Sequence, residues 1–385
     1  MTDTFMDNRY LALAQPGIQG LAAYDPGHDI AELRRRFGED RIVELGSNEN
    51  AHGPSPLARQ ALERAFAGIH RYPDPLGGDL KRAIAASIGI PRERLLLGNG
   101  SHELLMLIGQ TFAGPGLDVV ASQYGFLVYA LAAQCAGARY VAVPALPMSS
   151  SMPRGHDLDA LRAAVGPQTR LVYLANPNNP TGTWFSTGAL DRFLFGLPDH
   201  VLVVVDEAYI EYSTDPSLVS AVSLLERHAN LIVTRTFSKA HGLAGLRVGY
   251  ACAHPDLLQV LERPRESFNV NIPGLLACAA AIGDDAHIAR VREDNRAERE
   301  WLADQLRARD LRSGPSQTNF LLVDFETPAT PIESRMLAEG VVVRPMRGYG
   351  LPHCVRITVG DRGENLRMLD ALDRAMEAVS LASTA

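Results

Sequence analysis

The sequence predicts an α/β fold in which a mostly parallel, mixed β-sheet is flanked by helices. Two apolar runs rich in β-branched residues, 201–206 and 231–236, each end abruptly in polar residues. Such runs are typical of strands that are buried on both faces, as in parallel sheets. Strand-like and helix-like segments also alternate elsewhere in the chain, which indicates βαβ units.

One strand is expected to run against its neighbour. The apolar run that follows Lys239 starts at Val248, and only the eight residues 240–247 come between them. A parallel crossover needs about a dozen residues or more. We therefore expect an antiparallel strand from Val248 onward, which makes the sheet mixed.

The length of 385 residues predicts two domains. We expect residues 1–40 to form an N-terminal arm and part of a smaller domain, and residues 41–270 to form a large α/β domain. Residues 271–385 would form a small C-terminal α+β domain. The expected hinge lies around Pro264 and Pro273, which interrupt a helical pattern.

Composition excludes several classes of protein. The net charge of −7 and the lack of a basic block argue against nucleic acid as a partner. No run is long and apolar enough to predict a membrane span, and the first residues make a poor signal peptide. The four cysteines are scattered, which favours reduced thiols in the cytoplasm over disulfides or a metal site.

Two chemically active side chains follow the buried runs. Asp206 ends the first run and Lys239 comes just after the second. Because ligands bind at the carboxyl ends of strands in α/β sheets, we expect the two side chains to meet at one edge. A lysine amine forms a Schiff base with an aldehyde cofactor, and an acid keeps a pyridinium nitrogen protonated, so the pair suits pyridoxal phosphate.

Two further patterns indicate anion binding. Gly98 to His102 lie between an apolar run and a helical pattern, and a helix N-terminus offers free N–H groups to a phosphate. This signal is weak alone, since a plain strand–turn–helix corner has the same pattern. Arg344 and Arg356 lie on strand-like runs, where each needs a carboxylate or phosphate partner.

The chain resembles class II pyridoxal-phosphate-dependent aminotransferases of fold type I, and most closely the histidinol-phosphate aminotransferase family. The matching segments occur in family order over nearly the whole chain. They are SNENAHGPSP, RYPDP, LGNGSHELL, SQYGF, ANPNNPTGTW, VVVDEAYIEY, RTFSKAHGLAGLRVGY, FNVN, TNFLLVDF and VVVRPMRGYGLPHCVRITVG.

The resemblance implies a role for each matching residue. Lys239 would bind the cofactor covalently and move a proton between it and the substrate, while Asp206 would pair with the pyridinium nitrogen. Asn179 and Tyr209 would hydrogen-bond the phenolic oxygen of the cofactor, and Tyr124 would stack on its ring.

The resemblance also implies phosphate-binding, subunit and substrate contacts. The cofactor phosphate would be held by backbone amides at Ser101 and His102 and by Thr236, Ser238 and Arg247. Tyr72 would reach the phosphate of the other subunit, which implies a homodimer. Arg356 would bind the substrate carboxylate, with Asn179 nearby, and Tyr24 and Arg344 would line the end that takes a substrate phosphate.

Three positions depart from the family pattern. His241 stands where a bulky apolar or aromatic residue is usual, Ala51 replaces a proline, and His102 replaces an Asp or Asn. None of them removes a catalytic group. His241 and His102 are expected near the cofactor, where they shift its electronics or the choice of substrate, or else are neutral.

The expected function is amino-group transfer from glutamate to imidazole-acetol phosphate in a ping-pong reaction, a step of histidine biosynthesis. Two rivals share the fold: an aminotransferase for aromatic or secondary-metabolite amino acids, and a decarboxylase such as threonine-phosphate decarboxylase. A non-catalytic regulator is disfavoured, because a binding module needs neither Lys239 nor Asp206.

Overall fold

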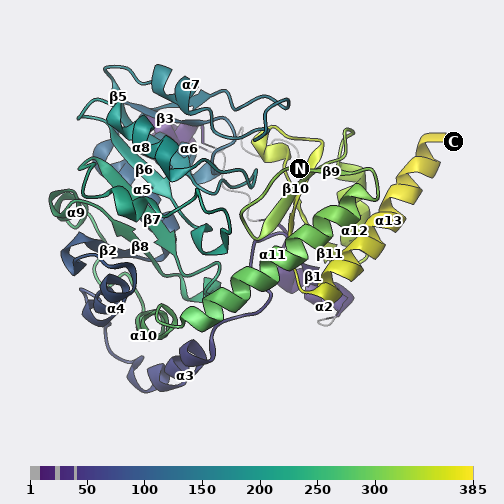
Figure 1. Ribbon diagram of the computed structural model, residues 1–385, viewed down its shortest axis with the longest axis horizontal. Coiled ribbons are helices and arrows are strands. Elements are labelled where there is room, and N and C mark those ends of the chain that lie inside the picture. Colours follow the sequence, from purple (N-terminus) through teal and green to yellow (C-terminus); the bar gives the residue numbers. More distant parts are fainter. Residues whose placement is uncertain (1–8, 22–26, 39–40, 385) are drawn as a thin grey trace.

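The computed structural model describes residues 9–21, 27–38 and 41–384. Figure 1 shows two bodies side by side, a larger one built on a wide sheet and a smaller one that contains the C-terminus. We call them the large and the small domain. The long helix α11 (Asp285–Arg307) runs from the edge of the large domain into the small one (Figure 1).

The large domain is built on a seven-stranded sheet with the order β2-β8-β7-β6-β5-β3-β4. Its strands are β2 (Leu95–Gly98), β3 (Asp118–Ser122), β4 (Arg139–Val143), β5 (Thr169–Ala175), β6 (Leu202–Asp206), β7 (Leu231–Thr236) and β8 (Gly249–Cys252). Strand β8 is antiparallel to both β7 and β2, and the other pairings are parallel. The predicted mixed sheet and the direction of β8 are confirmed.

Helices cover both faces of this sheet. Alternate residues of β6 face opposite cores, with Val203 on one side and Val204 on the other, which explains why the run is continuously apolar. The first core is covered by α3 (Pro56–Ala65), α4 (Gly78–Ile88), α7 (Leu158–Ala163), α8 (Thr187–Phe195) and α10 (Ile272–Ala281). The second is covered by α5 (Gly100–Phe112), α6 (Leu127–Cys135) and α9 (Pro255–Leu261).

The small domain has its own sheet and core. Its antiparallel sheet has the order β12-β13-β10-β9, and β1 pairs with β11 in a separate parallel ladder. The strands are β1 (Val43–Glu44), β9 (Arg312–Ser313), β10 (Phe320–Asp324), β11 (Val341–Val342), β12 (Arg344–Pro345) and β13 (Cys354–Thr358). Its core is packed by α11, α12 (Thr330–Ala338) and α13 (Arg362–Thr384). Shorter helices α1 (Pro16–Gln19) and α2 (Ile30–Phe37) precede it in the chain.

Packing places the domain boundary differently from the division expected at residue 270. Helix α10 was expected in the small domain, but it packs on α3 and α4 of the large domain. Strand β1 was expected in the large domain, but it pairs with β11 and its Val43 lies in the small-domain core. We propose that the large domain extends to about residue 282 and that residues 41–45 belong to the small one.

Among the residues that the structure describes, no single helix is long and apolar enough to cross a membrane. Helices α10 and α11 satisfy that test only together, as a pair bent by 80°.

Candidate active site

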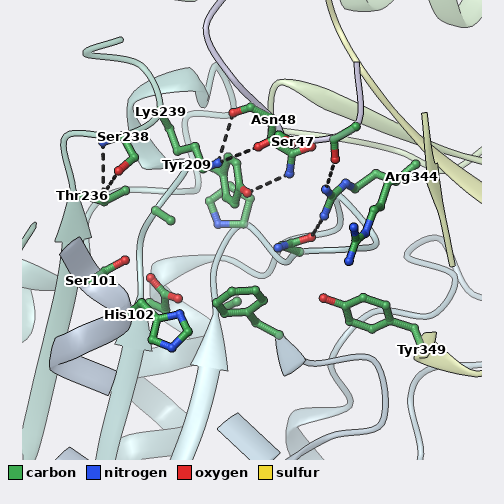
Figure 2. Close-up of a pocket in the computed structure, with 18 of the residues that line it drawn as sticks. Ser47, Asn48, Ser101, His102, Tyr209, Thr236, Ser238, Lys239, Arg344 and Tyr349 are labelled. Carbon is green, nitrogen blue, oxygen red and sulfur yellow. Dashed lines mark hydrogen bonds between the residues drawn. The ribbon is translucent and has the colours of Figure 1, made fainter. Parts of the chain in front are cut away.

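A cavity of about 210 Å³ lies where the two domains meet. It opens at the carboxyl ends of β6 and β7, and Figure 2 shows side chains from both domains converging on it. The predicted site residues that line it are Ser101, His102, Asn179, Asp206, Tyr209, Thr236, Ser238, Lys239, Arg247, Arg344 and Arg356. Residues far apart in the sequence are therefore brought together as the strand-end argument predicted.

Lys239 lines the cavity, where its amine meets the backbone of the segment that leads from β1. Its Nζ donates hydrogen bonds to the carbonyl oxygens of Ser47 at 3.1 Å and Asn48 at 3.2 Å (Figure 2). Burial, helped by the positive charge of Arg356, lowers the pKa of Lys239 to about 7. A large fraction of this amine is therefore uncharged near neutral pH, as a nucleophile or a base requires.

Asp206 is buried at the end of β6. Tyr129 Oη donates to Oδ2 at 3.2 Å and Thr234 Oγ1 donates to Oδ1 at 3.3 Å. Burial raises the pKa of Asp206 to about 6, although these two hydrogen bonds act in the opposite direction. A carboxylate that is costly to bury in this way is stabilised by a cation placed in the cavity beside it.

Tyr209 is fixed near the lysine by a residue that lies 161 positions earlier in the chain. Asn48 Nδ2 donates to Tyr209 Oη at 2.9 Å, and the tyrosine ring meets Phe320 edge-on at a centroid distance of 5.3 Å. Burial raises the pKa of Tyr209 to about 12, so its hydroxyl keeps its proton at neutral pH. The Tyr209 hydroxyl is therefore available as a hydrogen-bond donor.

An anion-binding cup lies at the other side of the cavity, at the start of α5. Ser101 and His102 belong to its first turn, where N–H groups have no partner within the helix. Thr236, Ser238 and Arg247 face the same space, and Arg247 Nη1 donates to Ser238 Oγ at 3.4 Å. Burial and the charge of Arg247 lower the pKa of His102, which favours its neutral form.

Two glycines keep this cup open. Gly100 has a φ of 81°, and a Cβ there would lie 2.7 Å from Arg247 Nη2. A Cβ at Gly249 would lie 2.5 Å from the backbone nitrogen of Ser101. Side chains at these positions would displace the groups that form the cup, so the chain requires glycine here.

Arg356 and Asn179 close the small-domain side of the cavity. Arg356 lies on β13, where Nη1 donates to Asn179 Oδ1 at 2.6 Å and Nη2 donates to the carbonyl of Gly46 at 2.7 Å. Asn179 lies in the loop after β5, which is held by Asn178 Nδ2 donating to the carbonyl of Tyr124 at 2.9 Å. Arg344 lies on β12 opposite Arg356, so both guanidinium groups belong to one hairpin.

The comparisons with known proteins agree with this geometry. Residues 40–372 match the family model for aminotransferases of class I and II. The chain belongs to this family. It is 45% identical to histidinol-phosphate aminotransferase 1 of Nitrosococcus oceani over 96% of this chain and 99% of that one. It is 46% identical to histidinol-phosphate aminotransferase 2 of Pseudomonas aeruginosa over 95% and 98%.

A solved structure gives the same result for the fold. The histidinol-phosphate aminotransferase of Sinorhizobium meliloti, in complex with pyridoxal 5′-phosphate, superimposes with a TM-score of 0.85 at 31% identity. The match covers 95% of this chain and 98% of that one. This aminotransferase is therefore a fold-type-I enzyme that depends on pyridoxal phosphate.

The residues present fit the cofactor. The cup accepts a phosphate, the buried Asp206 faces the cavity where a pyridinium proton is needed, and Lys239 offers an uncharged amine. Bound pyridoxal phosphate supplies an aldehyde that reacts with amines and a ring that withdraws electrons from the substrate Cα.

Two predicted residues, Tyr124 and Tyr72, do not line the cavity. Tyr124 packs instead beside Leu322 and Cys354 of the small domain, and Phe126, two residues later, supplies an aromatic ring to the cavity. The stacking role predicted for Tyr124 is therefore reassigned, as a proposal, to Phe126. Tyr72 is 81% exposed and stacks on Phe268. Tyr24 lies outside the described residues.

Sequence reasoning missed several cavity residues, including Asn48 and Tyr349. Asn48 has a φ of 56°, a conformation that asparagine tolerates better than most residues. The turn-rich segment SNEN was a signal for it. His241, by contrast, does not line the cavity: it is buried against Phe237, and burial lowers its pKa to about 3.

Proposed function

We propose that this enzyme transfers an amino group from glutamate to imidazole-acetol phosphate, which forms histidinol phosphate. The observation that carries the proposal is the placement of Arg344 and Arg356 on one hairpin at the small-domain side of the cavity. Glutamate presents a carboxylate and histidinol phosphate presents a phosphate. A guanidinium binds either anion because its planar fork matches the oxygens of both. The relatives that are 45% and 46% identical to this chain over nearly its whole length are both named histidinol-phosphate aminotransferase.

The protein side chains divide the work in this proposal. Arg356 binds the substrate anion and orients the reacting carbon toward Lys239. Lys239 would move a proton between the substrate Cα and the cofactor carbon. Its lowered pKa suits both removal and return of the proton. Asp206 holds the proton on the ring nitrogen, and Tyr209 donates its O–H to the ring oxygen. The cup at α5 fixes the phosphate end.

We also propose that the enzyme is a homodimer. Exposed apolar side chains gather between α3 and α4 and near the start of α10, namely Phe66, Ile69, Tyr72, Leu76, Phe268 and Leu276. Tyr72 and Phe268 stack with their ring centroids 4.6 Å apart although they are distant in sequence. An apolar face of this kind marks an interface, and a second copy of the chain would cover it.

Half-reaction spectra test the substrate. The purified enzyme is mixed with glutamate, histidinol phosphate, histidinol or an aromatic amino acid, and the cofactor absorbance is followed. We expect conversion with glutamate and histidinol phosphate, and much weaker conversion with histidinol, which lacks only the phosphate. A preference for phenylalanine or tyrosine would instead indicate the aromatic aminotransferase. Release of carbon dioxide from threonine phosphate would indicate the decarboxylase.

A further inference from the structure

The turn between β12 and β13 carries a cavity residue that none of the roles above uses. Met346 N donates to the carbonyl of Cys354 at 3.1 Å, and a short 3₁₀ helix, Arg347–Tyr349, ends at Gly350 with a φ of 72°. This turn places Tyr349 in the cavity lining, and Figure 2 shows its hydroxyl directed into the cavity. The position of the turn therefore sets the shape of the small-domain side of the site.

The turn is held against the large domain by an apolar contact. Tyr124, from the large-domain segment after β3, packs with Tyr349 on a buried cluster of the small domain that contains Leu322, Met346 and Leu351. The contact explains why Tyr124 lies outside the cavity. An apolar contact excludes water but does not fix direction by itself.

An ion pair crosses the domain boundary beside this contact. Arg154 Nη2 lies 2.5 Å from Asp324 Oδ2, with 18% and 15% of the two side chains exposed. Burial alone would raise the pKa of Asp324, yet the hydrogen bond from Arg154 holds it below its usual value. Arg154 comes from a large-domain loop in which Arg154 N donates to the carbonyl of Leu146 at 3.0 Å. Arg154 is therefore held by the backbone of the large domain, and Asp324 by strand β10 of the small domain.

Asp324 is coupled directly to the turn. It pairs across the sheet with Cys354, the first residue after the turn, and Phe325 N donates to the carbonyl of His353 at 3.0 Å. Arg154, Asp324 and residues 350–354 line a second cleft of about 290 Å³. Asp324 is thus joined by strand pairing and by a neighbouring hydrogen bond to the segment that follows Tyr349.

We propose that the Arg154–Asp324 ion pair, which we call the domain latch, positions the turn 347–350 and so keeps Tyr349 in the cavity. It is a pair of positioning residues that strengthens substrate binding without touching the reacting atoms. For histidinol phosphate this rests on the proposed function; for glutamate it needs only the aminotransferase reaction. If the ion pair is lost, part of the free energy of substrate binding is used to bring the turn into place. KM therefore rises while kcat is preserved.

A double-mutant cycle tests the latch. We expect Arg154→Met and Asp324→Asn each to raise KM for glutamate and for histidinol phosphate about tenfold, with kcat within about threefold of the wild type. The double variant should be no worse than either single one, because both break the same pair. Arg154→Lys, which keeps the charge, should recover part of the loss. Tenfold effects that multiply in the double variant, or single variants with an unchanged KM, would overturn the proposal.

A control variant separates the loss of the latch from an ordinary loss of stability. Arg309→Met removes a similar ion pair inside the small domain, where Nε lies 2.6 Å from Asp373 Oδ1, and should leave KM unchanged. If Asp324→Asn does not fold, Arg154→Met, on a surface loop, carries the test alone. A wild type inert toward histidinol phosphate would contradict the proposed function, and glutamate would still test the latch.

Discussion

Arg356 Nη1 donates to Asn179 Oδ1 at 2.6 Å, and this hydrogen bond joins a strand of the small domain to a loop of the large one inside the cavity. The arginine that is proposed to bind the substrate is therefore oriented by a residue that is proposed to contact the cofactor. Since the bond is buried, loss of either partner leaves a polar group without its partner, which is costly. The substrate and cofactor sides of the site are thus expected to respond together to mutation.

Lys239→Ala should abolish covalent attachment of the cofactor. The amine has a lowered pKa and Lys239 lines the cavity, so it is the nucleophile that the site provides. Wild-type enzyme should be yellow and contain a bond that borohydride reduces, whereas the variant should lack that bond and lose about 10³-fold or more in activity. Peptide mapping after reduction checks the position. A fully active Lys239→Ala enzyme would remove this assignment.

Asp206→Asn should have opposite effects on activity and on the stability of the cofactor-free enzyme. The folded-state pKa of Asp206 is raised to about 6, above its value of 3.8 in the unfolded chain. The stability that Asp206 contributes is therefore full below pH 4 and is lost as the pH rises through 6. The variant should thus be more stable than the wild-type apoenzyme at pH 8, by about 3 kcal/mol.

Thermal unfolding of the apoenzymes at pH 5 and pH 8 measures this difference, which should shrink at the lower pH. Transamination by the holoenzyme should fall by orders of magnitude, because the neutral amide no longer favours a protonated ring nitrogen. An unchanged rate would show that the electron-withdrawing role of the ring does not depend on Asp206.

Mixed dimers test the position of Tyr72. Its side chain is 81% exposed in the single chain, so any contact with a cofactor must be made in another subunit. Neither Tyr72→Phe nor Lys239→Ala alone should be fully active. After refolding together about half of the dimers are mixed, each with one native site, and activity should approach about a quarter of the wild-type value. No recovery from an impaired Tyr72→Phe enzyme would argue against this arrangement.

Phe126→Leu should weaken cofactor binding, and Tyr124→Leu is its matched control. Phe126 lines the cavity, whereas Tyr124 packs on the small-domain cluster. Loss of an aromatic stack should raise the Kd of pyridoxal phosphate about tenfold in the first variant and leave it nearly unchanged in the second. Fluorescence titration of the apoenzymes measures both constants. A larger rise of the Kd in Tyr124→Leu than in Phe126→Leu would return the stacking role to Tyr124.

Arginine substitutions separate the two substrates. Arg356→Lys should raise KM about tenfold in both half-reactions, because lysine keeps the charge but loses the planar fork. Arg344→Ala should weaken histidinol phosphate more than glutamate, as should Tyr24→Phe if the N-terminal arm reaches the site. Stopped-flow half-reactions give each constant separately. Equal effects of Arg344→Ala on both substrates would argue against a phosphate-binding role.

The sequence was most informative where burial alone decides the structure. The continuous apolar runs before Asp206 and Lys239 are typical of strands buried on both faces, and parallel strands of this kind end at one edge of a sheet. The connection between Lys239 and Val248 is too short for a parallel crossover, so it predicted that β8 runs antiparallel to β7, as observed. These features follow from local sequence and chain length, so they could be predicted without tertiary contacts.

Sequence reasoning fell short where contacts between distant segments, or the directions of side chains, determine the structure. Helix α10 is assigned to the large domain by its contact with α3, which lies about two hundred residues earlier in the chain, and no local pattern reveals that contact. Tyr124 and Phe126 are two residues apart in one turn, so small differences in backbone direction decide which ring enters the cavity. Tyr349 depends on the left-handed Gly350 that ends its turn.

The pairing of β1 with β11 has a consequence for how the protein folds during synthesis. The small domain takes one strand from residue 43 and its partner from residue 341, so it is incomplete until the ribosome has made nearly the whole chain. The large-domain sheet uses one continuous stretch, from Leu95 to Cys252. We expect the large domain to fold first on the ribosome, with the early strand waiting, exposed, for its late partner.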